Sequence, residues 1–439
     1  MKLHSETYDS YKNAEGEWSE TIPSEWQEKR VKDLFRLVTD AAPADNDYEL
    51  LSLYAGIGVK PRKDLEARGN KASSTDGYWI VRKNDIVVNK LLAWMGSVGL
   101  SEYDGVTSPA YDVLRKTQSE VDPRYFAYLF RTETAKKIFR KNSRGIMDMR
   151  LRLYFDKLGS ITVPFPSKNE QSSISDYIDT KTKQIDSRIR LLERKVELYN
   201  KLREKIIYEA ITEGIVDNIE TKESGVDWIG KIPNHWKLLR LKEISIVKTG
   251  STPPTSDDSF YCEVGTPWVK PDELNDFFYI KSSKVNLSVQ GLKKSTLIKK
   301  GSVLVCCIGS IGKLGVAGVD LTTNQQINSI TFNQEVMSEF GKYLIFGSRT
   351  EMVNLSVGNV VQILNSGKQK QIIYPIPPKK EQKNLYEYLD RKNSLIQKAI
   401  YIIKLQIEAL NKLKTTIIYD AVVGNIKIDK KAVSEGSNR

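Results

Sequence analysis

The chain has 439 residues, 40% of them hydrophobic and 28% charged, which is ordinary for a soluble globular protein and long enough for two or three domains. An excess of 67 Lys and Arg over 55 Asp and Glu gives a net charge of +12, which favours a polyanionic partner such as nucleic acid. No apolar run approaches the roughly 18–20 residues that cross a bilayer, and the N-terminal residues lack the apolar core of a signal peptide. We therefore expect no membrane role and a cytoplasmic location.

Near its start the chain contains a short Ile-Pro-x-x-Trp segment, and this segment occurs twice. Two further segments recur in the same order at an offset of 210 or 211 residues, and the paired ranges are Lys12–Trp18 and Lys222–Trp228, Ile22–Trp26 and Ile232–Trp236, and Pro164–Gln171 and Pro375–Gln382. Ordered matches at a nearly constant offset indicate a duplicated unit. The period is too long for a solenoid, whose repeats run roughly 20–50 residues.

Between the repeated segments, each half contains a variable stretch with mixed α and β signals. Asp85–Trp94 and Ser302–Gly309 have the apolar character of buried strands. Val121–Asn142 is predicted to be a helix that begins at a proline. We predict an α+β fold made of two mixed α/β domains and two long helices. The predicted segments are a first domain at 1–166, a first helix at 167–214, a second domain at 215–377, a second helix at 378–424 and a tail at 425–439.

Each predicted long helix carries an apolar seam in steps of seven, with a second series three or four residues away, as in a coiled coil. No Gly or Pro interrupts residues 169–213 or 379–423, so each helix could span about 65 Å at 1.5 Å per residue. The two seams could pair with each other, parallel or antiparallel, or each helix could pack on its own domain. The predicted seam residues are Ile178, Ile185, Ile189, Leu192, Val196, Tyr199 and Ile206, and Leu389, Ile396, Ile400, Ile403, Ile407, Leu410 and Ile417.

The motifs that suggest catalysis are incomplete. Leu53–Val59 is similar to the opening motif of cytosine methyltransferases, but no cysteine follows a proline, and the chain lacks an adenine methyltransferase Asn/Asp-Pro-Pro-aromatic tetrad. Gly309–Lys313 lacks the first glycine and the final Ser/Thr of a P-loop. "PDEL" at Pro271 lacks the acidic-x-Lys element of a nuclease. Three cysteines and two histidines give no zinc spacing and fit reduced thiols. We predict no catalytic residue, metal site or cofactor of its own.

The ordered duplication resembles the specificity subunits of type I restriction-modification systems. The resemblance rests on the paired Lys-x-x-Gly/Glu-x-x-Trp…Ile-Pro-x-x-Trp segments and the paired Pro-x-Pro…Glu-Gln segments before long helices, and it covers nearly the whole chain. Residues 14–16 and 224–226 differ, which affects only a turn. The resemblance implies two target recognition domains related by a pseudo-two-fold repeat, each reading half of a bipartite, asymmetric DNA site. It also implies an antiparallel coiled coil that sets the gap.

The resemblance further implies the partners. These are double-stranded DNA, two copies of an adenine methyltransferase subunit, and restriction subunits that act as motor and nuclease. Adenosylmethionine, ATP and Mg would belong to those subunits, and this chain would be non-catalytic. Two alternatives remain open: a diverged methyltransferase or nuclease acting alone, and a coiled-coil scaffold that binds no DNA.

Candidate DNA contacts follow from side-chain chemistry, because phosphates attract Lys and Arg while base edges are read by Arg, Asn, Gln and Ser. In the first domain the candidates are basic residues of two loops, Lys60, Arg62, Lys63, Arg68 and Lys71, and Arg140, Lys141 and Arg144. In the second domain they are mostly polar, namely Thr249, Ser251, Thr252, Lys270, Lys313, Asn324, Gln325 and Gln326. The two tryptophans of the repeated segments, Trp26 and Trp236, are interpreted as structural anchors.

Overall fold

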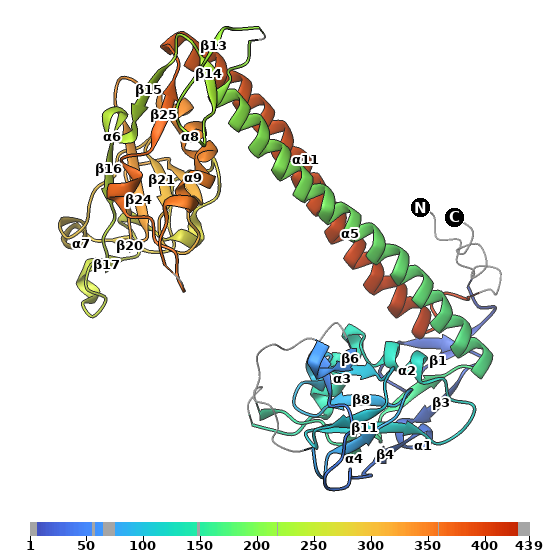
Figure 1. Ribbon diagram of the computed structural model, residues 1–439. Coiled ribbons are helices and arrows are strands. Elements are labelled where there is room, and N and C mark those ends of the chain that lie inside the picture. Colours follow the sequence, from blue (N-terminus) through green and yellow to red (C-terminus); the bar gives the residue numbers. More distant parts are fainter. Residues whose placement is uncertain are drawn as a thin grey trace. The chain divides into compact units, whose positions relative to one another are not determined.

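The computed structural model describes residues 7–54, 58–64, 75–146, 150–216, 218–358 and 360–428. The chain forms two compact units, of which unit 1 comprises residues 1–192 with 405–439 and unit 2 comprises 193–404. Each unit holds one mixed α/β domain and a part of both long helices (Figure 1). The unit boundaries lie inside the helices, so the five predicted segments stay a prediction.

The repeated segments form the same two antiparallel ribbons in each unit. The Ile-Pro of each Ile-Pro-x-x-Trp segment lies in the second strand of a hairpin, and the strand that follows its Trp pairs with the strand that precedes the long helix. In unit 1 these pairs are β1 (Tyr11–Asn13) with β2 (Thr21–Pro23) and β3 (Gln27–Arg30) with β12 (Thr162–Phe165). In unit 2 they are β13 (Thr221–Glu223) with β14 (Lys231–Pro233) and β15 (Lys237–Arg240) with β25 (Ile373–Ile376).

Each variable domain has its own central sheet, and the two sheets have the same strand order. Unit 1 has the strand order β4 (Phe35–Val38), β11 (Tyr111–Lys116), β8 (Ile86–Asn89), β9 (Val98–Leu100). Unit 2 has β16 (Ser245–Thr249), β24 (Ile327–Phe332), β21 (Val303–Cys306), β22 (Leu314–Ala317), and adds a parallel edge strand, β19 (Tyr279–Ile280). The strand order therefore confirms the internal repeat in parts of the sequence that have diverged.

Smaller elements surround these sheets and differ more between the units. Unit 1 has α1 (Val31–Leu34), β5 (Leu51–Tyr54), β6 (Gly58–Pro61), η1 (Arg62–Asp64), β7 (Trp79–Val81), η2 (Ala93–Met95), β10 (Gly105–Thr107) and α4 (Phe155–Leu158). Unit 2 has α6 (Leu241–Ile244), η4 (Asp258–Phe260), β17 (Tyr261–Cys262), β18 (Thr266–Val269), η5 (Pro271–Glu273), β20 (Asn286–Leu287), α7 (Val289–Lys293), β23 (Thr322–Thr323), α8 (Ser338–Gly347), α9 (Arg349–Leu355) and α10 (Ser366–Gln369).

Local polar side chains divide one predicted element and shorten another. The helix predicted over Val121–Asn142 is two helices, α2 (Pro123–Leu129) and α3 (Glu133–Asn142), because the Thr132 side chain accepts the Ala135 N–H and starts a new helix. The strand predicted over Asp85–Trp94 ends at Asn89, whose side chain accepts the Leu91 N–H and turns the chain.

The long helices are α5 (Lys168–Thr212) and α11 (Lys379–Val422), which confirms the two-helix prediction. In unit 1 the start of α5 shares a core with the end of α11, and Lys414 forms an ion pair with Asp186 at 2.7 Å. In unit 2 the end of α5 shares a core with the start of α11. The pairing is therefore antiparallel within each unit. Every predicted seam residue is buried or half-buried.

The repeated Glu-Gln pair fastens the start of each long helix. Oε1 of Gln171 accepts the Asp122 N–H at 2.9 Å, and its Nε2 donates to Pro166 O at 2.8 Å and Glu120 O at 3.2 Å. Gln382 makes the matching bonds with the backbone of Met337, Pro377 and Glu335. Both glutamine side chains are fully buried, so the same polar groups need the same partners in both copies. The preceding Glu of each pair accepts the indole N–H of Trp26 or Trp236.

Candidate nucleic-acid interface

In unit 2, the end of β16 and the loop after it meet the start of β24 and the loop before it. Thr249 Oγ1 donates to Asn328 Oδ1 at 2.8 Å, and Thr252 donates to Gln325 Oε1. Between them, a Cβ on Gly250 would lie 2.3 Å from Asn324 O, so only glycine allows the two loops to approach this closely. Two segments more than 70 residues apart thus form one polar surface.

The end of β18 and the η5 turn complete this surface. Trp268 Nε1 donates to Ser251 O at 3.0 Å, and the Lys270 ammonium lies 4.9 Å from the Trp268 ring centroid. Lys313 Nζ donates to the carbonyl of Pro271 at 2.8 Å. The eight candidates predicted in the second domain therefore lie on segments that contact one another. They are here called the polar cluster: Thr249, Ser251, Thr252, Lys270, Lys313, Asn324, Gln325 and Gln326.

The polar cluster has a rigid base and an exposed rim. Asn324 is buried, and its Nδ2 donates to Gln326 Oε1 at 2.8 Å, so it positions the neighbouring amide. Thr252 and Gln325 are exposed and hold each other in place. Exposed amide and hydroxyl groups on a rigid base suit recognition of base edges, and flanking ammonium groups suit phosphates.

Sequence reasoning missed members of this surface in unit 2. Lys294 is exposed, and its carbonyl accepts the Ser251 hydroxyl at 3.3 Å, which places it beside the cluster. Trp268 is buried and orders the loop through its indole. The adjacent lysines in "GLKKS" were the available signal for Lys294, but their distance from Ser251 in sequence concealed the contact.

In unit 1, the predicted basic residues form two groups on different elements. Lys60, on β6, donates to Tyr103 Oη at 3.2 Å and to Glu102 at 3.3 Å, and the bond to Tyr103 raises the Lys60 pKa. Arg62 and Lys63 follow on η1, where Lys63 pairs with Glu49. Arg68 and Lys71 lie outside the described residues.

The second group lies on α3 and the segment after it. The Arg140 guanidinium lies 5.4 Å from the Trp94 ring centroid. Lys141 pairs with Glu17 at 2.7 Å, and Arg144 pairs with Asp156 at 3.0 Å. These ion pairs are exposed, so they would exchange readily for a phosphate partner. The assignment of both groups to DNA contact stays a prediction.

The surface of unit 1 that matches the polar cluster lies elsewhere. Since β4 and β11 occupy the places of β16 and β24, the matching loops are residues 39–42 and 108–110. They contain Asp40 and Ser108, and Lys90 Nζ donates to Pro109 O at 2.7 Å beside them. Ser108 and Lys90 are thus candidates that sequence reasoning missed. The signal was the segment "TSPA", which precedes the same central strand as "TNQQ" does in unit 2.

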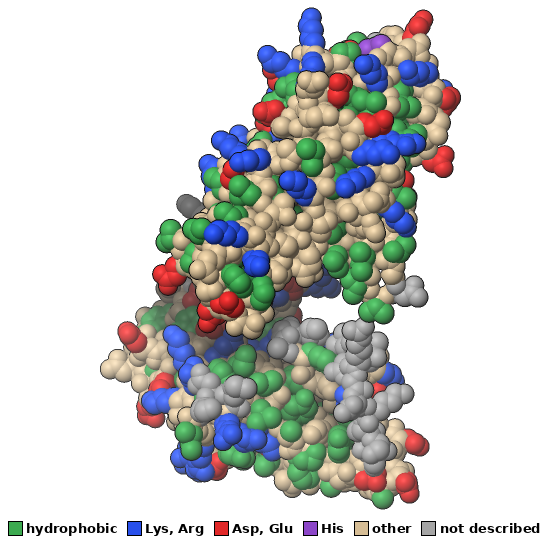
Figure 2. Space-filling view, turned by 90° about the vertical axis from the view of Figure 1, so that its left-hand side faces the viewer, with side chains coloured by type: hydrophobic (Ala, Val, Ile, Leu, Met, Phe, Trp, Pro, Cys, Tyr) green, Lys and Arg blue, Asp and Glu red, His purple; other side chains and the backbone are tan. Residues whose placement is uncertain are grey.

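Charge alone does not mark these surfaces. On the face drawn in Figure 2, the Lys and Arg side chains in the upper part of the view are dispersed among uncharged and acidic side chains. The arrangement of polar loops is therefore more informative than the net charge.

The described residues hold no group of three His, Cys, Asp or Glu side chains able to bind a metal ion. In the same residues, no helix is long and apolar enough to cross a membrane. The Gly309–Lys313 segment, which is similar to a P-loop, forms the turn between β21 and β22, with Gly309 and Gly312 at φ of +80° and +79°. These glycines serve a turn conformation.

Relatives of the chain are specificity subunits. It is 23% identical over 423 residues to the type I restriction enzyme MjaVIII specificity subunit of Methanocaldococcus jannaschii, covering 93% of this chain and 94% of the relative. It is 30% identical over 192 residues to the MjaIX specificity subunit of the same organism, covering 42% and 43%. With the EcoBI specificity subunit of Escherichia coli it shares 23% identity over 290 residues, covering 62% and 59%.

Solved structures share the fold. A chain from work on complex assembly and conformational transition of the type I R-M system aligns with a TM-score of 0.71 at 15% identity, covering 92% of this chain and 99% of that one. The HsdS subunit of Thermoanaerobacter tengcongensis aligns with a TM-score of 0.50 at 15% identity, covering 92% and 98%. The sequence profile of the type I restriction modification DNA specificity domain matches residues 23–196 and again 233–412. The chain therefore belongs to the type I restriction-modification DNA specificity family.

Proposed function

We propose that the chain is the DNA-recognition subunit of a type I restriction-modification complex and reads a bipartite, asymmetric site. The observation that carries this proposal is that both units have the same strand order but present different polar surfaces. The same strand order presents Thr252 and Gln325 in unit 2, but Asp40 and Ser108 in unit 1. Different donors and acceptors select different bases, so the two half-sites should differ.

The chain acts as a non-catalytic assembly platform in this proposal. Two adenine methyltransferase subunits and the restriction subunits supply the chemistry, with adenosylmethionine, ATP and Mg bound to them. The relatives' names as specificity subunits and the incomplete catalytic motifs support this division of labour. Linking two recognition domains in one chain raises the affinity for a two-part site through effective concentration. The complex would work in the cytoplasm, where the DNA is.

The test is methylation mapping of genomic DNA from a host that expresses the chain with its adenine methyltransferase subunit. The matched control expresses the methyltransferase subunit alone. We expect N6-methyladenine at one non-palindromic motif with a fixed gap, only when this chain is present. An intact complex that adds no such motif would contradict the proposal and favour the scaffold or the unrecognised enzyme.

A further inference from the structure

In unit 2, an aromatic side chain from a loop fills the space between the domain and the long helices. Phe277 stacks on Tyr343 with ring centroids 4.9 Å apart, and lies 4.8 Å from the Phe346 ring. The guanidinium of Arg203, on α5, lies 5.9 Å from the Phe277 centroid. Phe277 has a φ of +63°, which a bulky residue rarely adopts, so the surrounding contacts hold the backbone there.

An acidic residue accompanies this ring. Asp276 accepts a hydrogen bond from Arg349 and lies 3.8 Å from Arg203. The loop thus inserts a carboxylate and a ring together, and each meets a cationic side chain. A cation over an aromatic face and a paired carboxylate stabilise the insertion jointly.

The internal repeat identifies the matching place in unit 1. The Tyr343 hydroxyl donates to Asp390 on α11, and the Tyr128 hydroxyl donates to Asp179 on α5. Asp179 precedes Asp390 by 211 residues, and Tyr128 precedes Tyr343 by 215. Tyr128 is therefore the counterpart of Tyr343. Lys414 on α11 is the counterpart of Arg203 on α5 at an offset of 211 residues.

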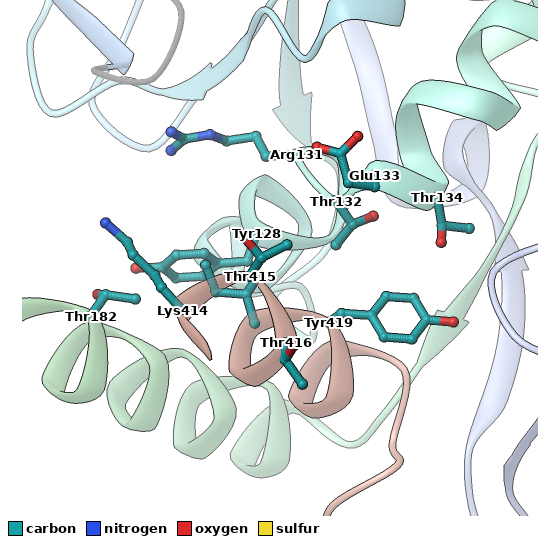
Figure 3. Close-up of a pocket in the computed structure, with 11 residues that line it drawn as sticks. Tyr128, Arg131, Thr132, Glu133, Thr134, Thr182, Lys414, Thr415, Thr416 and Tyr419 are labelled. Carbon is teal, nitrogen blue, oxygen red and sulfur yellow. The ribbon is translucent and has the colours of Figure 1, made fainter. Parts of the chain in front are cut away.

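Unit 1 has a pocket of about 520 Å³ at this place, lined in part by Tyr128, Arg131, Thr182, Lys414 and Thr415. Figure 3 shows the Lys414 side chain beside the Tyr128 ring, with Thr182 and Thr415 close by. Among the residues that the structure describes, none stacks a ring on Tyr128 as Phe277 does on Tyr343. Unit 1 keeps the tyrosine with its carboxylate partner and the helix cation. Arg349, which binds Asp276 and lies six residues after Tyr343, is matched by Thr134, six residues after Tyr128. Among the described residues, the inserted ring is present in unit 2 alone.

We propose that this pocket receives an aromatic side chain, preceded by an acidic residue, from a partner protein. The ring would lie on Tyr128 with the Lys414 ammonium over it. Lys414 is held in position by Asp186 at 2.7 Å and 2.8 Å. Arg131 has five N–H donors and can bind the partner's carboxylate in addition to its present interaction. The acidic Glu133 at the rim is paired with Lys136 at 2.6 Å, and Asp179 is engaged by Tyr128.

The occupant is therefore a protein segment and not a nucleotide. In unit 2 the matching tyrosine and helix cation are satisfied by an Asp-Phe pair on a loop, and no phosphate is needed there. This contact does not depend on which DNA site is read. It makes unit 1 the side of the subunit where a partner completes the packing, while unit 2 completes its own.

The probe is a fluorescent peptide with the chain's own sequence from residues 274–280, LNDFFYI. Fluorescence anisotropy of the full-length chain should show saturable binding, in roughly the millimolar to micromolar range expected of a ligand of this size. Binding should be lost when alanine replaces the first phenylalanine of the peptide. The Thr415→Trp variant should also abolish binding, because Thr415 is exposed and its replacement fills the pocket.

A matched control is Asn411→Trp, which changes an exposed residue of α11 outside the pocket lining and should leave binding unchanged. The Phe277→Ala variant should open the counterpart site in unit 2 and raise the stoichiometry from one peptide to two. No saturable binding by the wild-type chain, or binding that survives Thr415→Trp, would overturn the proposal.

Discussion

Trp26 donates its indole N–H to the carboxylate of Glu170 at 3.0 Å, across 144 residues of sequence. Trp236 and Glu381 repeat the bond at 2.9 Å. Both tryptophans are 1% exposed, so each glutamate satisfies a donor that is withdrawn from water. The bond joins the repeated Ile-Pro-x-x-Trp segment to the repeated Glu-Gln pair, and this shared requirement is why both sequences recur together.

Glu381→Ala should destabilise unit 2 by about 1–3 kcal/mol, because it leaves a buried indole N–H without an acceptor. Chemical denaturation followed by tryptophan fluorescence measures the loss. Glu193→Ala, an exposed change on α5, is the control and should cost no more than about 0.5 kcal/mol. Equal effects from both substitutions would show that the bond to Trp236 contributes nothing.

Removing Asp390 should destabilise the protein more than removing Lys342, although the two side chains form one ion pair. Lys342 is 3% exposed and lies 5.1–5.4 Å from the centroids of three tyrosine rings, whereas the Asp390 side chain is 47% exposed. Asp390→Ala leaves a buried ammonium unpaired and should cost about 3 kcal/mol. Lys342→Met leaves a hydrated carboxylate that still accepts from Tyr343, and should cost about 1 kcal/mol. Urea unfolding compares the two, and a larger loss for Lys342→Met would refute the asymmetry.

Cys307 should make stability fall at alkaline pH. Burial raises the pKa of its thiol to about 11 from the usual 9.0. Above pH 9 the unfolded thiol loses its proton while the folded one keeps it, so the unfolded state binds fewer protons and stability decreases until about pH 11. The Cys307→Ala variant lacks this titration. The difference between its free energy of unfolding and that of the wild type should therefore shrink by about 2–3 kcal/mol across that range. Val305→Ala, in the same core, is the control, and its loss of unfolding free energy should stay constant over the same pH range.

Base-reading and phosphate-binding residues should differ in their effects on DNA affinity. Gln325→Ala should cost about 1–3 kcal/mol on the cognate site and relax one half-site only. Lys294→Ala should weaken cognate and unrelated DNA alike and reduce the slope of log affinity against log salt by about 1. Titrations of the assembled methyltransferase complex at several salt concentrations separate the two. A uniform loss from Gln325→Ala would exclude it from base reading.

The long helices and the repeated segments that fasten them could be predicted from the sequence, because their signals are local and repeated. The seam from Ile178 to Ile206 needs only a period of seven, and the Glu-Gln pairs recur at a fixed offset. The division between α2 and α3 was missed because the bond from Ala135 N–H to Thr132 overrides an unbroken apolar pattern. A helical period cannot reveal such a cap.

The candidate interface was predictable to different degrees in the two units. In unit 2 the loops are rich in Thr, Ser, Asn and Gln, and the narrow approach at Gly250 brings them together. In unit 1 the counting of basic residues selected Lys60 and Arg140, on different elements, and passed over Ser108. Which loops are neighbours depends on strand pairing between β4 and β11, and no local signal encodes that pairing.

The antiparallel helix pair has a consequence for the order in which the chain folds during synthesis. Unit 2 is one uninterrupted segment, 193–404, whereas unit 1 needs residues on both sides of it. Ile417, Ala421 and Val422 are buried in the same core as Trp18 and Tyr125, and the Tyr125 hydroxyl donates to Val422 O at 2.7 Å. The domain translated first therefore waits for the second to emerge before its core closes, and a released chain that ends before residue 417 would let unit 2 fold while unit 1 stays open.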